Sequence, residues 1–424
     1  DFIIAKSMGK CGENRKGTKK ALLITSLAVN LGILGFFKYF NFFAQSFERV
    51  VAPLGLHPDF VTLNILLPIG ISFYTFQTMA YVIDVYRGNE KPCKNFWDFA
   101  LYVAFFPSLV AGPIERSTNL IPQIQKPRLI TRAMIYSACQ LILMGYFKKV
   151  FIADGVAPIV NECFATPDKF GGVTLFLAAV LFMIQVYGDF SGYTDIARGV
   201  ARLFGINVML NFRQPFLSAN ITEFWQHWHI SLMLWFKDYV YIPLLNALTN
   251  RSRYVWVWMY FSLMTLMFLS GLWHGASMHF VIWGILHGIL LCIHATIRSK
   301  RLFQFKSVSK EWKIFFWILS IVCTFTLVVL VQIFFRANSC SAACHYLYLI
   351  TRGGHAGFAD VWLYVKVYGL CVLLLDVLCY YQNSEVPFTE KWWAPVRGFA
   401  YACMLFLLVF IGENDVQPFI YFQF

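Results

Sequence analysis

Long apolar stretches constrain this chain more than any other feature of its sequence. A helix needs about 20 consecutive, mainly apolar residues to cross a bilayer, because the hydrocarbon core is about 30 Å thick. Only 13% of the 424 residues are charged, about half the share in soluble domains. The sequence therefore predicts an all-α, polytopic transmembrane protein that forms a single membrane-embedded domain over residues 1–424. The expected membrane segments are residues 21–43, 61–86, 96–114, 133–152, 173–196, 254–273, 279–296, 314–335, 361–381 and 398–411.

Two of these segments contain helix-breaking residues. Pro68 and Gly70 interrupt the second segment, and the third ends in a run that contains Pro107 and Gly112. Non-helical backbone at membrane depth is tolerated only where neighbouring protein satisfies its polar groups. We therefore expect a kinked or broken helix in the second segment and a re-entrant segment in the third.

The basic residues are concentrated between the apolar segments. Lys and Arg outnumber Asp and Glu by 35 to 22, which gives a net charge of +13. Basic loops of this kind mark the cytoplasmic side of a membrane protein, so nucleic acid is not an expected partner. Lys148 and Lys149 fall at the end of the fourth segment, where long side chains can extend to the interface.

Other classes of site have little support in the sequence. The eleven cysteines are scattered and form no Cys-x-x-Cys pair, so neither a disulfide framework nor a metal site is expected. No serine nucleophile elbow, P-loop or dinucleotide fingerprint occurs. The chain opens on Asp1 with what reads like the end of a helix, so we expect the natural protein to begin further upstream.

Two histidines lie in aromatic, apolar surroundings. Asn220 and Glu223 have the spacing of a capping box, which predicts a helix that begins at Ile221 and ends at Pro243. At 100° per residue, His229 falls on the apolar side of this helix and His227 on the polar side. His229 is then either catalytic or a core histidine bonded to a carbonyl group. The predicted apolar stripe contains Trp225, Trp228, Leu232, Trp235, Phe236 and Tyr239.

The second histidine, His274, lies between Gly271 and Gly275. Small residues at this spacing permit close approach of helices or of a ligand. A histidine has an ordinary pKa of about 6.5, which suits a general base, although a structural hydrogen bond is an equally open role. His287 and His294 share one helical face, and we expect interhelical hydrogen bonds or interfacial positions for them rather than catalysis.

Two carboxylates, Asp189 and Asp195, lie within or at the end of the fifth segment. Ionisable groups in an apolar helix favour a wet cavity or a polar network. Alternatively, they could cap the helix at the membrane interface, and the sequence leaves both interpretations open.

Seven motifs together resemble the membrane-bound O-acyltransferase family, in its bacterial polysaccharide branch. The resemblance implies a ring of helices around a central tunnel, with His274 as the active-site histidine and His229 as a second functional histidine. The motifs occupy residues 68–77 (PIGISFYTFQ), 106–114 (FPSLVAGPI), 189–195 (DFSGYTD), 211–216 (NFRQPF), 224–232 (FWQHWHISL), 272–276 (LWHGA) and 419–422 (FIYF).

The resemblance also implies a function and partners. The donor would be acetyl-coenzyme A or another acyl thioester on the cytoplasmic side, with no tightly bound cofactor. An extracytoplasmic serine-esterase-like protein would pass the acyl group to a polysaccharide or peptidoglycan at the bacterial inner membrane. His274 would act as a base or would briefly carry the acyl group.

Three alternatives remain at this stage. D-alanyl transfer from a carrier-protein thioester to teichoic acid is the nearest in chemistry. A transporter or flippase would also contain broken helices and intramembrane carboxylates. A scaffold that only recruits the extracytoplasmic partner is the third.

Overall fold

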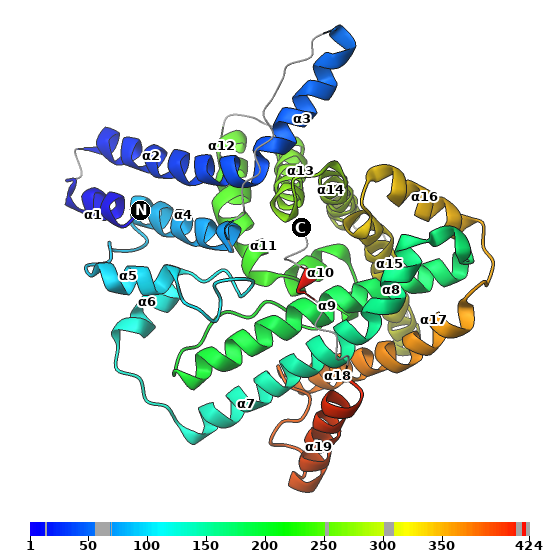
Figure 1. Ribbon diagram of the computed structural model, residues 1–424. Coiled ribbons are helices and arrows are strands. Elements are labelled where there is room, and N and C mark those ends of the chain that lie inside the picture. Colours follow the sequence, from blue (N-terminus) through cyan, green and yellow to red (C-terminus); the bar gives the residue numbers. More distant parts are fainter. Residues whose placement is uncertain are drawn as a thin grey trace. The chain divides into compact units, whose positions relative to one another are not determined.

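The computed structural model describes residues 1–12, 15–55, 68, 70–250, 254–300, 309–412 and 418–420, the side chain of Arg49 excepted. Every regular element in these residues is helical (Figure 1), which confirms the all-α prediction. They form two compact units. The first contains Asp1–Met134 and Ala201–Met209, and the second contains Ile135–Val200 and Leu210–Phe424.

Seven helices in the described residues are long and apolar enough to cross a membrane. Each overlaps one of the ten expected segments. Of the other three segments, 61–86 lies partly outside the described residues, 96–114 is not a continuous helix, and 398–411 falls within a shorter apolar helix. The seven are Lys16–Leu54, Arg132–Ala165, Gly172–Leu203, Val255–His274, Met278–Ser299, Lys310–Arg336 and Phe358–Gln382.

In the first unit, α1, α2 and α4 pack on one another, and α5 and α6 pack beside α4. The segment that follows α5, residues 104–116, is non-helical and contains Pro107 and Gly112. The Tyr102 hydroxyl holds it against α4 by donating to the carbonyl oxygens of Gln77 and Glu115, both at 3.1 Å. The helices of this unit are α1 (Phe2–Lys10), α2 (Lys16–Leu34), a π-helix (Gly35–Tyr39), α3 (Phe40–Val51), a 3-10 turn (Ala52–Leu54), α4 (Ile71–Arg87), α5 (Phe96–Val103) and α6 (Ser117–Gln125).

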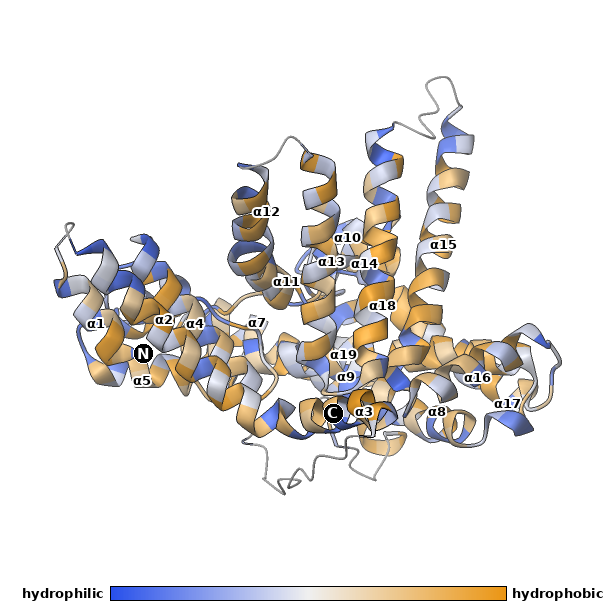
Figure 2. Cartoon of the chain, turned by 90° about the horizontal axis from the view of Figure 1, so that it is seen from above, coloured by the Kyte–Doolittle hydropathy of each residue, from blue (hydrophilic) through white to orange (hydrophobic). Residues whose placement is uncertain are grey.

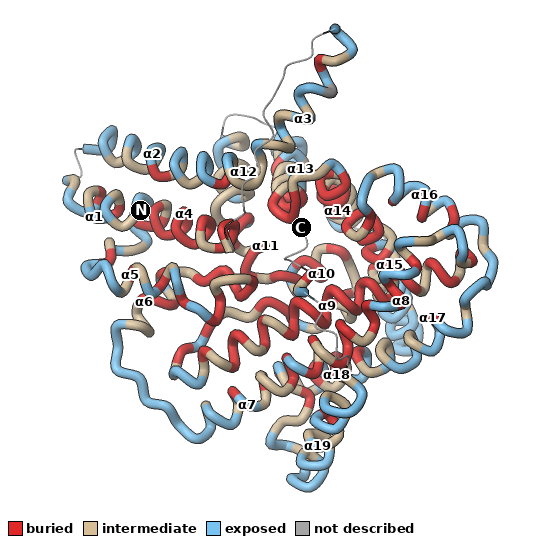
Figure 3. The backbone as a smooth tube through the Cα atoms, viewed as in Figure 1, coloured by how far each residue is buried: buried red, intermediate tan, exposed pale blue. Residues whose placement is uncertain are grey.

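In the second unit, α9 is buried along most of its length (Figure 3). Figure 2 shows α13, α14 and α15 as neighbouring, largely apolar rods, and their consecutive members pack together. The α-helices are α7 (Arg132–Tyr146), which begins in the first unit, α8 (Gly155–Ala165), α9 (Gly172–Leu203), α10 (Ile221–His227), α11 (Ile230–Phe236), α12 (Ile242–Thr249), α13 (Val255–His274), α14 (Met278–Ser299), α15 (Lys310–Arg336), α16 (Cys340–Thr351), α17 (Phe358–Tyr364), α18 (Leu370–Gln382) and α19 (Ala394–Phe410). The π-helices are Phe147–Asp154, Lys237–Tyr241 and Val365–Gly369, and the 3-10 turns are Pro167–Lys169 and Pro215–Leu217.

The expectation that Lys148 and Lys149 extend to the interface is wrong. The helix continues past them to Ala165, so both lysines lie in its interior and face α9. Lys148 pairs with Asp195 at 2.8 Å, and Lys149 pairs with Asp154 at 2.8 Å and with Asp189 at 2.7 Å. Such groups are costly at membrane depth unless they are paired, and that cost explains why the lysines turn inward.

In the second unit, α13 and α14 pack closely beside the end of α13, where His274 lies. A Cβ atom at Gly271 of α13 would lie 2.3 Å from the carbonyl oxygen of Phe280 on α14, and one at Gly284 would lie 2.3 Å from that of Met267. The two helices can therefore meet at this distance only with glycine at both positions. The sequence correctly singled out Gly271 as a point of close approach, and Gly284 is the partner it missed.

We expect Gly271→Ala to lower the free energy of unfolding by about 1–3 kcal/mol, because the new methyl group must separate two backbones. Since His274 follows one turn later, its position should change as well. Gly398→Ala in α19 is the matched control, because no atom lies within 4 Å of a Cβ built there. Denaturant titration of both variants measures the difference, and equal stability would contradict the tight crossing.

Candidate active site

His229 lies at a break between two short helices rather than inside one helix. Asn220 caps α10 by accepting the backbone N–H of Glu223 at 2.9 Å, and α10 begins at Ile221 as predicted. The predicted continuity to Pro243 is wrong. The helix ends at His227, restarts at Ile230, and the second run continues through a π-helix past Pro243 to Thr249.

The break places His229 in the left-handed region, with φ 45° and ψ 51°. Few non-glycine residues adopt this conformation, so neighbouring residues must stabilise it. Asn211 does so on the C-terminal side, where its carbonyl oxygen accepts the N–H of Ile230 at 3.0 Å and its side-chain oxygen accepts that of Ser231 at 3.2 Å. On the other side, the N–H of Arg213 donates to the carbonyl oxygen of His227 at 3.0 Å.

The imidazole of His229 points into the protein, as predicted, and is 1% exposed. Its ring centroid lies 4.6 Å from that of Phe190 and 5.7 Å from that of Trp273, both edge to face. Burial lowers the pKa of His229 below its ordinary value, so the ring is neutral near pH 7. His227 is only half-buried and has Nδ1 3.3 Å from the hydroxyl of Ser218, which agrees with the separation of the two histidines made from the sequence.

His274 is the last residue of α13 and is 7% exposed. Three aromatic rings surround its imidazole edge to face: Trp273 and Trp283 with centroids at 5.0 Å, and Phe335 at 5.1 Å. Because Trp273 contacts both His274 and His229, one indole ring joins the two histidines that the sequence singled out. They come from different helices, so the structure has brought them together.

A third buried histidine extends this group. The ring of His287 lies 4.9 Å from those of Trp283 and Trp225, and its nitrogens bond to no partner among the described residues. The expected interhelical hydrogen bond of His287 is therefore not seen in this part of the chain, whereas His294 lies 2.7 Å from the hydroxyl of Thr222 on α10 as expected. The sequence analysis did not predict the contact between the rings of Trp283 and His287. Their i, i+4 spacing on one helix was the signal that could have indicated it.

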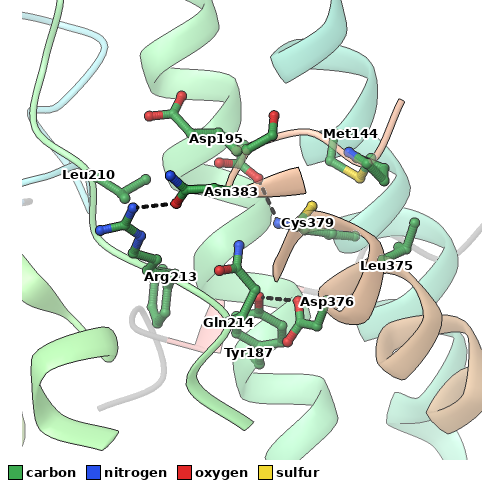
Figure 4. Close-up of a pocket in the computed structure, with 15 residues that line it drawn as sticks. Met144, Tyr187, Asp195, Leu210, Arg213, Gln214, Leu375, Asp376, Cys379 and Asn383 are labelled. Carbon is green, nitrogen blue, oxygen red and sulfur yellow. Dashed lines mark hydrogen bonds and ion pairs between the residues drawn. The ribbon is translucent and has the colours of Figure 1, made fainter. Parts of the chain in front are cut away.

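A second feature of this unit is a polar cavity of about 320 Å³ (Figure 4). Lys148 and Asp195 form an ion pair at its wall, and the Tyr187 hydroxyl donates to Asp376 at 2.8 Å. The structure therefore favours the cavity interpretation of Asp195 over a role as an interfacial cap. Its wall is formed by Met144, Lys148, Tyr187, Asp195, Leu210, Phe212, Arg213, Gln214, Leu375, Asp376, Cys379, Asn383, Ser384, Glu385 and Pro387.

The cavity lies close to His229 through two rings. Phe212 lines the cavity, its ring lies 5.0 Å from that of Phe190, and Phe190 contacts His229. At the wall of the cavity, Arg213 donates to the side-chain oxygen of Asn383 at 2.9 Å. Among the described residues, no group of three or more His, Cys, Asp and Glu side chains is placed to hold a metal ion.

Helices of membrane length that enclose histidines within aromatic walls define an integral membrane protein with a shielded imidazole centre. The family model described as MBOAT, membrane-bound O-acyltransferase family, matches residues 92–333, and this chain belongs to that family.

Three kinds of relative are similar to this chain. A probable alginate O-acetylase from Azotobacter vinelandii is 41% identical over 74% of this chain and 63% of its own length. A peptidoglycan O-acetyltransferase from Helicobacter pylori is 31% identical over 96% of this chain and 83% of its length. A teichoic acid D-alanyltransferase from Bacillus subtilis is 30% identical over 54% of this chain. The chain thus spans less than two thirds of the length of the first relative.

Asn211 offers a test of how the break is maintained. We expect Asn211→Ala to lower the free energy of unfolding by about 1–2 kcal/mol, since a buried hydrogen bond to Ser231 is lost. In the folded fraction His229 should also be held less firmly, so any turnover that depends on His229 should fall. Gln226→Ala, at an exposed position of α10, is the control. Unchanged turnover per folded molecule of Asn211→Ala would show that this bond does not position His229.

Proposed function

We propose that this protein is a membrane O-acyltransferase that takes an acetyl group from a cytoplasmic thioester for O-acetylation of a cell-surface polysaccharide or peptidoglycan. The observation that carries the proposal is that the rings of His274 and His229 both contact the Trp273 indole. In a bacterium the protein would lie in the inner membrane. An extracytoplasmic serine-esterase-like partner would complete the transfer to the glycan.

In this proposal His274 is the catalytic base. A neutral imidazole removes the proton of the attacking hydroxyl as its oxygen bonds to the thioester carbonyl carbon. The carbon–sulfur bond then breaks, and the leaving thiolate takes the proton back from the imidazolium. The aromatic rings around His274 exclude water, so hydrolysis of the donor would be slow. A transient acyl-imidazole is the other route, and trapping a labelled acyl group on His274 distinguishes it.

We place His229 beside the reacting groups rather than in the proton transfer itself. Its neutral ring can accept a hydrogen bond from an incoming hydroxyl or donate one to a developing oxyanion. The polar cavity next to Phe212 offers the donor's polar arm a place, because it combines amides, carboxylates and cations. Phe212 and Phe190 would have to rotate for a donor in that cavity to reach His229.

The choice of acyl group rests on the relatives. The two O-acetylating relatives above match more of this chain than the teichoic acid D-alanyltransferase does, which favours acetyl over D-alanyl. Purified protein supplied with labelled acetyl-coenzyme A and acceptor should transfer label. Absence of that label, together with transfer from an aminoacylated carrier protein, would replace acetylation by D-alanylation.

A further inference from the structure

Lys366 lies in the interior of a candidate membrane span. It belongs to the π-helical turn Val365–Gly369, inside the span Phe358–Gln382, and its side chain is exposed. Lys148 and Lys149 are also interior lysines, but each has a carboxylate within 2.8 Å. Within the described residues, Lys366 has no carboxylate at ion-pair distance.

Asp360 lies six residues from Lys366 towards the N-terminal end of the same helical run, about 9 Å along a helix, and forms no ion pair with it within the described residues. Asp376 is ten residues from Lys366, which is about 15 Å along a helix, and it accepts a hydrogen bond from Tyr187. A cation at membrane depth without a counter-ion is costly. An anion from outside the chain is therefore the expected partner of Lys366.

An apolar groove of about 470 Å³ lies beside Lys366. Most of its wall belongs to α9, α15 and the span that contains Lys366, which are candidate membrane helices, and Phe216 and Leu217 of the 3-10 turn Pro215–Leu217 complete it. The groove is open to the surroundings, since Leu373 and Trp362 are 49% and 40% exposed. At membrane depth those surroundings are lipid. The apolar lining includes Val180, Ile184, Val322, Phe325, Trp362 and Leu373.

The direction of the Lys366 side chain follows from helix geometry. Side chains in a helix tilt towards its N-terminus, and Lys366 is eight residues, or about 12 Å, from Phe358 at that end. A lysine stem can extend along apolar surface to bring the ammonium group towards the interface. Trp362 lies one turn nearer that end, and tryptophan is enriched at the headgroup level of a bilayer.

We propose that the groove binds one acyl chain of an anionic phospholipid whose phosphate pairs with Lys366. A zwitterionic lipid carries its own ammonium group, so an anionic headgroup should be preferred. The basic loops predict that the Phe358 end is extracytoplasmic, and the lipid therefore belongs to the outer leaflet of the inner membrane. Asp376 lines both this groove and the polar cavity, so the two sites share one wall residue, whereas the apolar residues named above line the groove and not that cavity.

Native mass spectrometry tests this site on protein purified from membranes and supplied with phosphatidylglycerol and phosphatidylcholine. We expect wild type to retain one phosphatidylglycerol about fivefold more tightly than phosphatidylcholine, the ratio for one lysine near a headgroup. Lys366→Arg should keep this preference, and Lys366→Met should lose it. Methionine keeps the stem length and is apolar, so the variant should still fold in a bilayer.

Two further variants locate the lipid. Leu373→Trp fills the groove and should reduce binding of both lipids at the site, whereas Lys169→Met, at an exposed position outside the candidate spans, should change nothing. His274→Ala should also retain the lipid, which separates this proposal from the catalytic one. Equal preference in wild type and Lys366→Met would overturn the ion pair, and unchanged binding by Leu373→Trp would overturn the groove.

Discussion

Replacement of His274 by alanine should reduce acyl transfer by about 10²–10⁴-fold, the range that a positioned general base contributes. The imidazole would be the group that accepts the hydroxyl proton, and it lies among the rings of Trp273, Trp283 and Phe335. The loss should appear in kcat, because the proton moves in the chemical step rather than on binding.

The measurement is label transfer from acetyl-coenzyme A by purified protein, with surface acetylation in cells as a second readout. His345→Ala is the matched control, since that histidine is half-exposed and pairs with Asp168 at 3.0 Å. His274→Gln is a second variant that removes the imidazole but keeps a polar side chain of similar size, so the aromatic pocket should not collapse. Normal turnover by a well-folded His274→Ala protein would rule out catalysis at this residue and would favour a scaffold or a transporter.

Lys149→Met should lower the free energy of unfolding by about 3–5 kcal/mol, the usual effect of removing one partner of a buried ion pair. The side chains of Asp154 and Asp189 are 8% and 3% exposed and would both lose their cation. Asp189 also accepts the backbone N–H of Ile420 at 2.9 Å, so the C-terminal segment should loosen as well.

Thermal or denaturant unfolding in detergent measures this loss, with Lys169→Met at an exposed site as the control. The double variant Lys149→Met with Asp189→Asn should recover part of the stability, because one uncompensated charge is removed with its partner. A loss below about 1 kcal/mol for Lys149→Met would mean that the pair behaves like an exposed one.

Much of the membrane architecture follows from local sequence. Seven of the ten expected segments overlap helices of membrane length. In a bilayer, a run of about 20 apolar residues must satisfy its own backbone hydrogen bonds, and a helix does so. One of the three exceptions has a local cause. The run after residue 96 is interrupted by Pro107 and Gly112, and it forms only the short helix α5 and an irregular segment.

The sequence also predicted that His229 points inward, but for a reason that proved wrong. Helical phase assumed one continuous helix, whereas the chain breaks at Trp228 and His229. Asn211 supports that break from about 20 residues away in the chain. A left-handed residue held by a distant side chain leaves no periodic trace, so no pattern within residues 220–243 could reveal it.

Composition and motif order were sufficient to predict a helical membrane protein and to select His274 and His229, since both depend on residue type and short-range spacing. Tertiary structure alone decided that both histidines contact the Trp273 ring, that Gly271 meets Gly284 one turn before His274, and that a third histidine, His287, packs against Trp283. It also turned Lys148 and Lys149 away from the interface towards Asp195, Asp154 and Asp189. The physical reason is that long-range pairing depends on how helices pack, and the cost of burying a charge becomes defined only once its neighbours are in place.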